Sequence, residues 1–600
     1  MLLREVLCFF EHLCGIGDLL CVDFRKDAMP ARNRKRSRQR KIQGDNKPLL
    51  LKNRPDLSGR VSDIRWTRMR VLALSGVVLL ALVINLIGLD WGRCGNTPWE
   101  SDAIEGSLTV GHMQLMFKKW QHKYPRGHYI INGIFYYPLL KHWENSPIRG
   151  VGSDGGTRSF TLDLKRLDFL AAISRWIVLV MSLGTMWAVF LISRYLFGDF
   201  RPALLAVLTL AVSQLFVFFS KVGCVDIPAI FWLTWATYFA VRAVYEGRRS
   251  QYILMGFCAA YTFCTKEGSL GYVLGLGLAT WVLMSYVRFK QGGGLKKAVL
   301  SVFSLKTAAA AAVFIGVFLL LNGFLGGPDE FMERVEFWTR TNFRRAKKSQ
   351  WVILNQTWKD IYFGLGWPLF VVTAGSIIYF AYKNTFKLLF FLLPLIVFYL
   401  STVTRLNFIV ARYLMPAYIG FSIIVGKSLV DLIRWKKAPA YLSYGFIGII
   451  YGLSLLYCVG LSLEMRSDTR KRTEDWFLRN VSKNATVGTG MSKNYAPHLY
   501  WHGYRQIFDW NNQGNITPTG KRVFVPDYLV LSDSWPVDSR RVNKEFMENI
   551  GKEGSQYEYV ASFKARYVPP ARTVFGIAGW PMNKHGFLSP PMYVARKKSR

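Results

Sequence analysis

Long apolar runs alternate with short polar connections between positions 71 and 463. Apolar runs of about 18 or more residues are typical of helices that cross a bilayer. The pattern therefore predicts an all-α polytopic membrane protein with about eleven transmembrane helices, and it excludes a soluble enzyme. The expected spans are 71–89, 174–196, 203–220, 226–245, 252–265, 268–287, 303–324, 366–382, 388–403, 411–430 and 441–463.

Polar segments divide the chain into three parts. Residues 1–70 form a basic N-terminal tail, and residues 71–463 form the transmembrane domain with two long loops, 90–172 and 325–365. Residues 464–600 are predicted to fold as a small α/β domain. Within this domain we expect an amphipathic helix followed by four short strands, at 468–480, 485–488, 523–532, 557–563 and 592–595.

The charge balance fits a membrane topology. The 77 Lys and Arg residues exceed the 38 Asp and Glu residues, which gives a net charge of +39. The short basic connections between predicted spans all fall on the side of the N-terminal tail, and such connections are typically cytoplasmic. We therefore expect a cytoplasmic N-terminus, an extracytoplasmic C-terminus and affinity for anionic lipid or phosphate rather than nucleic acid.

Cysteine usage bears on the compartment. Eight cysteines are present and none follows Cys458, so the C-terminal domain has no disulfide framework. A basic run follows Met29, and a true start at this methionine would explain the unusual segment 1–28. Both observations favour a bacterial inner membrane.

Two acidic residues follow the first predicted span. Asp102 and Glu105 are three positions apart, so they would share one face if a helix begins here, with Ser101 as its cap. Acidic residues in a first helical turn can also simply complement the helix dipole. The residues alone leave both interpretations open.

Further charged residues fall near the same predicted membrane face. Lys123 precedes an aromatic stretch, Asp226 precedes a span, Lys266 interrupts an apolar region and Arg412 lies near the end of a span. Interfacial anchoring by Lys123 and helix capping by Asp226 are the structural alternatives. Taken together, the set suits transfer from an anionic lipid-linked donor: a carboxylate can accept the acceptor's proton, and cations can neutralise a departing phosphate. In the loop 325–365, a group of six basic residues suggests an anionic ligand: Arg334, Arg340, Arg344, Arg345, Lys347 and Lys348.

The order of these motifs resembles the polyprenyl-phosphate-dependent glycosyltransferases of the GT-C fold, specifically glycosyltransferase family 39. This family includes protein O-mannosyltransferases and the bacterial aminoarabinose transferase that acts on lipid A. The resemblance covers roughly 71–430, and residues 102–113 have the form of the family motif after span one. The resemblance implies that Asp102 is the catalytic aspartate. The family has Asp-Glu where this chain has Asp102-Ala103, which leaves Glu105 or Glu100 as the second carboxylate.

Four shorter matches extend the resemblance. Lys123-Tyr-Pro resembles a Lys-Pro-Pro segment, Thr265-Lys-Glu-Gly resembles a Thr-Lys-Gly turn, Asp226-Ile-Pro matches an Asp-x-Pro motif, and Arg412-Tyr-x-x-Pro matches a late family signature. The resemblance implies that Lys123, Lys266 and Arg412 hold the donor phosphate. It also implies that Asp226 orients the acceptor or a basic side chain.

The function implied by the resemblance is inverting transfer of a sugar from a polyprenyl-phosphate donor to an acceptor on the non-cytoplasmic face. Asp102 would act as general base, assisted by Glu105. The sequence has no clear Asp-x-Asp motif, so we expect no metal cofactor. The expected partners are the donor, a protein, lipid or glycan acceptor, and membrane lipids. The alternatives are a ligase or flippase for lipid-linked glycans, or a transporter, although the chain lacks the internal repeat typical of many transporters.

Overall fold

The computed structural model describes residues 67–94, 98–100, 102–114, 124–144, 164–292, 294–322, 329, 332–333, 336, 349–404, 409–435, 439–508, 510, 525–532, 544–567 and 588–598. All of them belong to the larger of two compact units, 56–600.

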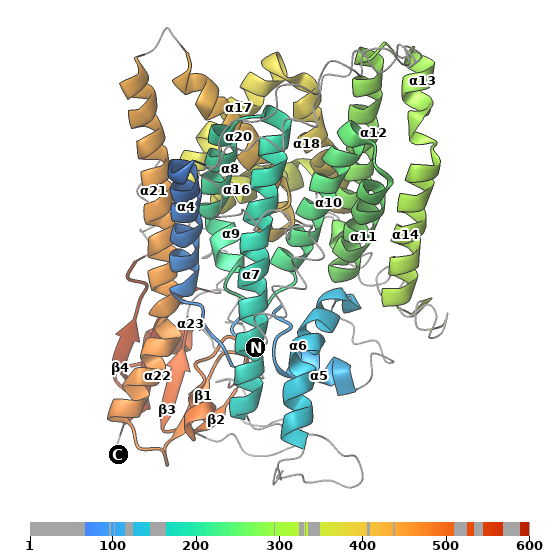
Figure 1. Cartoon of the computed structure of the whole chain (residues 1–600). Helices are drawn as coiled ribbons and strands as arrows, with labels where there is room; N and C mark the ends of the chain where they lie inside the picture. The colour runs from blue at the N-terminus through green and yellow to red at the C-terminus, as the bar shows by residue number, and fades with distance from the viewer. Residues whose placement is uncertain are drawn as a thin grey trace, which may run out of the picture. The chain divides into compact units, whose positions relative to one another are not determined.

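Helices dominate this unit (Figure 1). Among the described residues, seven helical stretches are long and apolar enough to cross a membrane. They contain α4 (Arg68–Leu86), α7 (Leu164–Phe197), α10 (Asp226–Glu246), α12 (Leu270–Lys290), α13 and α14 (Leu295–Val299 and Leu305–Leu321), α18 (Thr385–Phe398) and α21 (Ala440–Arg466).

A multi-pass membrane protein is therefore confirmed, while the count of eleven spans stays a prediction. An eighth span is counted if α16 (Gln350–Leu365) and α17 (Trp367–Lys383), bent by 116°, form one broken span. The remaining predicted spans fall on the shorter helices α8 (Phe200–Ala211), α9 (Gln214–Phe219), α11 (Arg249–Thr265) and α20 (Ala417–Ile433).

Two helix breaks have distinctive residues, Lys266 between α11 and α12 and Gly366 between α16 and α17. Between α11 and α12 the chain makes a 3-10 turn, η2 (Glu267–Ser269), and Lys266 before it is extended with φ −150°. Between α16 and α17, Gly366 has φ +79°, a left-handed conformation that favours glycine. Charge and glycine thus mark the points where apolar helices break. Helix α16 also shows that 350–365, expected within a polar loop, is helical.

The connection after α4 folds differently from the expectation that a helix begins near Asp102. Helix α5 (Ser107–Gln114) starts only at Ser107, and it is followed by α6 (Arg126–Glu144). Asp102 and Glu105 therefore both lie in turns that precede α5. The condition for a shared helical face is therefore not met, because the helical spacing rule does not apply to turns.

The small C-terminal α/β domain is confirmed. Helix α22 (Thr469–Asn480) is followed by a five-stranded sheet of order β2-β1-β3-β5-β4, in which β1 runs parallel to β2 and β3, and β5 runs antiparallel to β3 and β4. The core of this domain includes Phe477, Val487, Val530 and Val594. Strand β2 and helix α23 were not predicted. Strands and short helices are β1 (Thr486–Thr489), η7 (Leu499–His502), β2 (Arg505–Ile507), β3 (Tyr528–Leu531), α23 (Lys544–Asn549), β4 (Tyr557–Phe563) and β5 (Met592–Lys597).

Candidate active site

Glu105 is held in a buried ion pair with Arg175 of α7. The guanidinium donates to the two carboxylate oxygens at 2.7 and 2.8 Å, and both side chains are at most 1% exposed. The same guanidinium donates to the carbonyls of Leu89 and Trp91. Glu105 therefore ties the connection after α4 to α7. This contact gives it a packing role that the sequence did not indicate.

Asp102 forms an ion pair with Arg412, which η6 (Ala411–Leu414) supplies from more than three hundred residues away. Glu100 joins this pair: one of its carboxylate oxygens lies 3.8 Å from Arg412 and accepts the backbone N–H of Asp102 at 3.2 Å. The structure thus brings Glu100, rather than Glu105, next to Asp102 and Arg412. From the sequence, Glu100 is only the alternative to Glu105 as the second carboxylate.

Burial sets the chemistry of Glu100. Its side chain is 2% exposed, and this burial raises the pKa of Glu100 to about 7, although the nearby Arg412 guanidinium lowers it. The negative charge of Asp102 contributes to the increase. A carboxyl group that exchanges its proton near neutral pH is a feature of sites that carry out acid–base chemistry.

A second ion pair joins Asp226 to Lys266. Asp226 is the first residue of α10, and Lys266 lies at the break between α11 and α12. The Lys266 ammonium lies 4.7 Å from the centroid of the Tyr413 ring, and the Arg412 guanidinium lies 5.9 Å from the same centroid. The Tyr413 ring therefore lies within the range of cation–π attraction to both Lys266 and Arg412. Within the described part of the chain, the second carboxylate oxygen of Asp226 is buried without a hydrogen bond.

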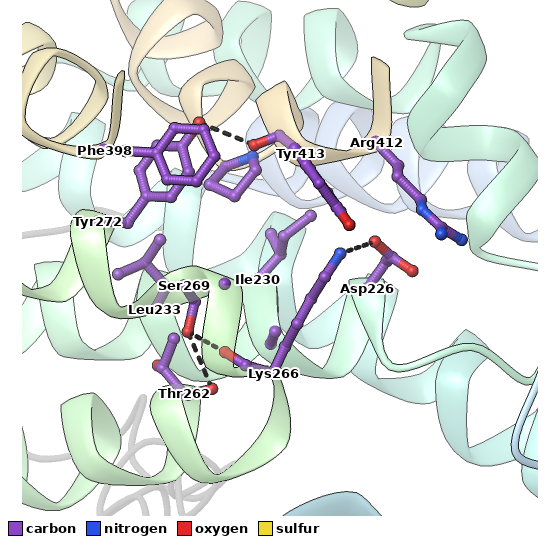
Figure 2. Close-up of a pocket in the computed structure, with 13 residues that line it drawn as sticks. Asp226, Ile230, Leu233, Thr262, Lys266, Ser269, Tyr272, Phe398, Arg412 and Tyr413 are labelled. Carbon is purple, nitrogen blue, oxygen red and sulfur yellow. Dashed lines mark hydrogen bonds and ion pairs between the residues drawn. The ribbon is translucent and has the colours of Figure 1, made fainter. Parts of the chain in front are cut away.

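The two cations line one pocket (Figure 2), which is partly open to solvent and contains about 360 Å³ of empty space. Figure 2 shows the side chains of Lys266, Asp226 and Tyr413 pointing toward one another, with Arg412 beside Asp226. The rest of the lining is mainly apolar or aromatic. Tyr272 and Phe398 stack with 4.3 Å between their centroids, and the Tyr272 hydroxyl donates to the carbonyl of Tyr413. The pocket thus offers a charged end and an apolar end.

Not every predicted residue can be placed. Lys123 lies outside the described residues, as do the six basic residues predicted to bind an anion in the loop 325–365. Among the described residues, no three His, Cys, Asp or Glu side chains are grouped so that they could hold a metal ion. Metal independence nevertheless stays a prediction.

Comparison with known proteins supports the resemblance. Residues 168–320 match the family model described as dolichyl-phosphate-mannose-protein mannosyltransferase. No curated protein matches the chain significantly. The matched segment contains Asp226 and Lys266, while Asp102 and Arg412 lie outside it.

Two solved structures align with 87% and 42% of this chain. The crystal structure of ArnT from Cupriavidus metallidurans bound to undecaprenyl phosphate shares 13% identity over 87% of this chain and 97% of that chain, with a TM-score of 0.44. The S. cerevisiae protein O-mannosyltransferase Pmt1-Pmt2 complex, bound to its sugar donor, shares 15% identity over 42% of this chain and 33% of that chain, with a TM-score of 0.30. Over residues 168–320, the family model confirms the expected similarity to polyprenyl-phosphate-dependent glycosyltransferases.

Proposed function

We propose that this protein is an integral-membrane glycosyltransferase that moves a sugar from a polyprenyl-phosphate donor to an acceptor. The proposal rests on one observation above all. Asp102 pairs with Arg412, and Arg412 lines the same pocket as the Lys266–Asp226 pair. The proposed general base, the two cations proposed to bind phosphate and an apolar surface come from distant parts of the chain.

Each group has a chemical part in the proposed reaction. Arg412 and Lys266 bind the donor phosphate, and the apolar lining accommodates the first units of the prenyl chain. Asp102 accepts the proton of the acceptor hydroxyl or amine as that atom bonds to the anomeric carbon. The bond between the anomeric carbon and the phosphate oxygen breaks, and its electrons stay on the phosphate, whose growing charge the cations stabilise. Attack opposite the leaving group inverts the anomeric carbon.

The second carboxylate is assigned to Glu100. Its oxygen accepts the Asp102 backbone N–H and lies near Arg412, so it can share the positive charge of that residue. Asp226 lies against Lys266 and is proposed to orient that cation or the acceptor. Lys123 stays a proposed phosphate ligand, and we propose that the reaction needs no metal.

Release of polyprenyl phosphate from a labelled polyprenyl-phosphate sugar tests the proposal directly. Purified protein in lipid nanodiscs is expected to release it, and Asp102→Asn is expected to reduce turnover by about 100-fold or more, since a positioned general base contributes on that scale. Asp90→Asn provides a matched control, because Asp90 is an exposed aspartate in the same connection. Equal turnover in Asp102→Asn and wild type would remove Asp102 from the mechanism.

We also propose that the site faces the extracytoplasmic side of a bacterial inner membrane. The basic connections between helices support a cytoplasmic tail 1–70, a transmembrane domain 71–463 and an external domain 464–600. Labelling of single cysteines with an impermeant reagent in intact spheroplasts tests this arrangement. A cysteine placed at Glu553 in the C-terminal domain is expected to react, and protection of this site until lysis would reverse the orientation.

A further inference from the structure

Two tryptophans of the connection after α4 are buried against the C-terminal domain. Trp91 and Trp99 are each 2% exposed. The indole N–H of Trp91 donates to Asp468 at 2.8 Å, and that of Trp99 donates to the carbonyl of Ala496 at 3.0 Å. The Trp99 ring also stacks on His498, with 5.3 Å between centroids. The segment that carries Glu100 and Asp102 is therefore held in place by residues nearly four hundred positions away in the sequence.

A buried arginine of α22 joins the two indoles. The Arg470 guanidinium lies 4.1 Å from the centroid of Trp99 and 5.4 Å from that of Trp91, within the range of cation–π attraction. Asp468 balances its charge through two hydrogen bonds of 2.8 and 2.9 Å, and neither side chain is exposed. Asp468 also accepts the backbone N–H of Ser589. The cation and its counter-ion thus both belong to the C-terminal domain, while the rings belong to the membrane domain.

The chain between this contact and the proposed base is short. Trp99 directly precedes Glu100 and stands three positions before Asp102. Three residues span at most about 10 Å even when extended, so Asp102 cannot stay in place if Trp99 moves far. Gly92 packs against the Trp99 ring so closely that an added Cβ would lie 2.6 Å from it. The Trp99 ring is therefore closely packed against Gly92.

We propose that Arg470 is a positioning residue that acts through Trp99 to hold Asp102 against Arg412. The C-terminal domain then sets the geometry of the site without contacting the donor. The catalytic consequence rests on the function proposed above, whereas the contact itself can be tested without any substrate.

Two measurements on the full chain in lipid nanodiscs test the contact and its catalytic consequence separately. Hydrogen exchange reports the backbone N–H of Ile104, which is bonded to the carbonyl of Gly223 at 2.9 Å. Arg470→Met is expected to speed this exchange, because the indoles lose their shared cation. Turnover of a polyprenyl-phosphate sugar is expected to show kcat reduced by about 100-fold, as misplacement by about 1 Å can do, with KM for the donor within about twofold of wild type.

Three further variants complete the test. Arg470→Lys keeps a cation above the ring and is expected to recover part of kcat. Arg479→Met is the matched control, since Arg479 is an exposed arginine of the same helix. Trp99→Leu keeps the ion pair of Arg470 with Asp468. If Arg470→Met does not fold, this variant tests whether Trp99 holds Asp102 against Arg412.

The outcomes are distinct. Wild-type exchange and kcat in folded Arg470→Met or Trp99→Leu would overturn the proposal. A loss of kcat matched by an equal rise in donor KM would do the same, because it would indicate lost donor binding. Absence of turnover in the wild type with every donor tested would instead refute the proposed function, and exchange at Ile104 would still decide whether Arg470 orders the segment.

Discussion

Replacement of Glu100 by glutamine removes one titration from the site and leaves its shape nearly unchanged. Burial raises the pKa of Glu100 from an ordinary 4.5 to about 7. The folded protein therefore binds this proton more tightly than the unfolded chain does. Stability from this proton is fully present below pH 4.5 and is lost as the pH rises toward about 7.

The magnitude follows from the two pKa values. Their difference corresponds to about 3 kcal/mol of unfolding free energy, since one pKa unit is worth about 1.4 kcal/mol. Glutamine carries no titrating proton, so Glu100→Gln is expected to gain about that much stability relative to wild type between pH 4.5 and pH 7. Above pH 7 the difference is expected to level off.

Thermal unfolding in one detergent over a pH series measures this difference. Subtracting the variant from the wild type cancels the titrations that the two proteins share. Glu553→Gln is the control, because Glu553 is an exposed glutamate outside the site. Parallel curves for wild type and Glu100→Gln between pH 4.5 and pH 7 would refute the raised pKa of Glu100.

Three other substitutions test the packing and charge of the site. Arg175→Met is expected to lower the unfolding free energy by about 3–5 kcal/mol because it leaves Glu105 buried and unpaired, and adding Glu105→Gln is expected to recover part of the loss in thermal unfolding. Gly223→Ala places a Cβ against the Glu105 carboxylate and is expected to cost about 1–3 kcal/mol, whereas Gly277→Ala, with open space around it, is expected to unfold like wild type. Lys266→Met is expected to weaken binding of polyprenyl phosphate by about 10-fold or more, measured by titration in nanodiscs, and an unchanged Kd would remove this cation from the phosphate site.

Much of the architecture could be predicted from the sequence because a helix that crosses a bilayer needs a long apolar run. Apolar runs locate helices, and alternating patterns located β4 at its observed bounds. The three-residue strand β2 carries too short a pattern to detect. The break at Lys266 was visible as charge within an apolar region, since such charges are costly unless they have a partner or a function.

The partners within the site could be predicted only in part. Motif order suggested that Asp102, Arg412 and Lys266 lie near one another, but spacing alone favoured Glu105 over Glu100 because it assumed a helix. Arg175 accounts for the difference, because it forms a buried ion pair with Glu105. A lone arginine at the start of the apolar run 174–196 is itself a signal for a buried partner.

The two ion pairs of the pocket have a consequence for the order of events. Each cation is matched by a carboxylate, Arg412 by Asp102 and Lys266 by Asp226. A donor phosphate bound as proposed would compete with those carboxylates, and its contact with Arg412 would weaken the pairing of Arg412 with Asp102. The proposed base would thus stay paired until a donor binds. We therefore expect compulsory binding order, with the lipid-linked sugar entering before the acceptor.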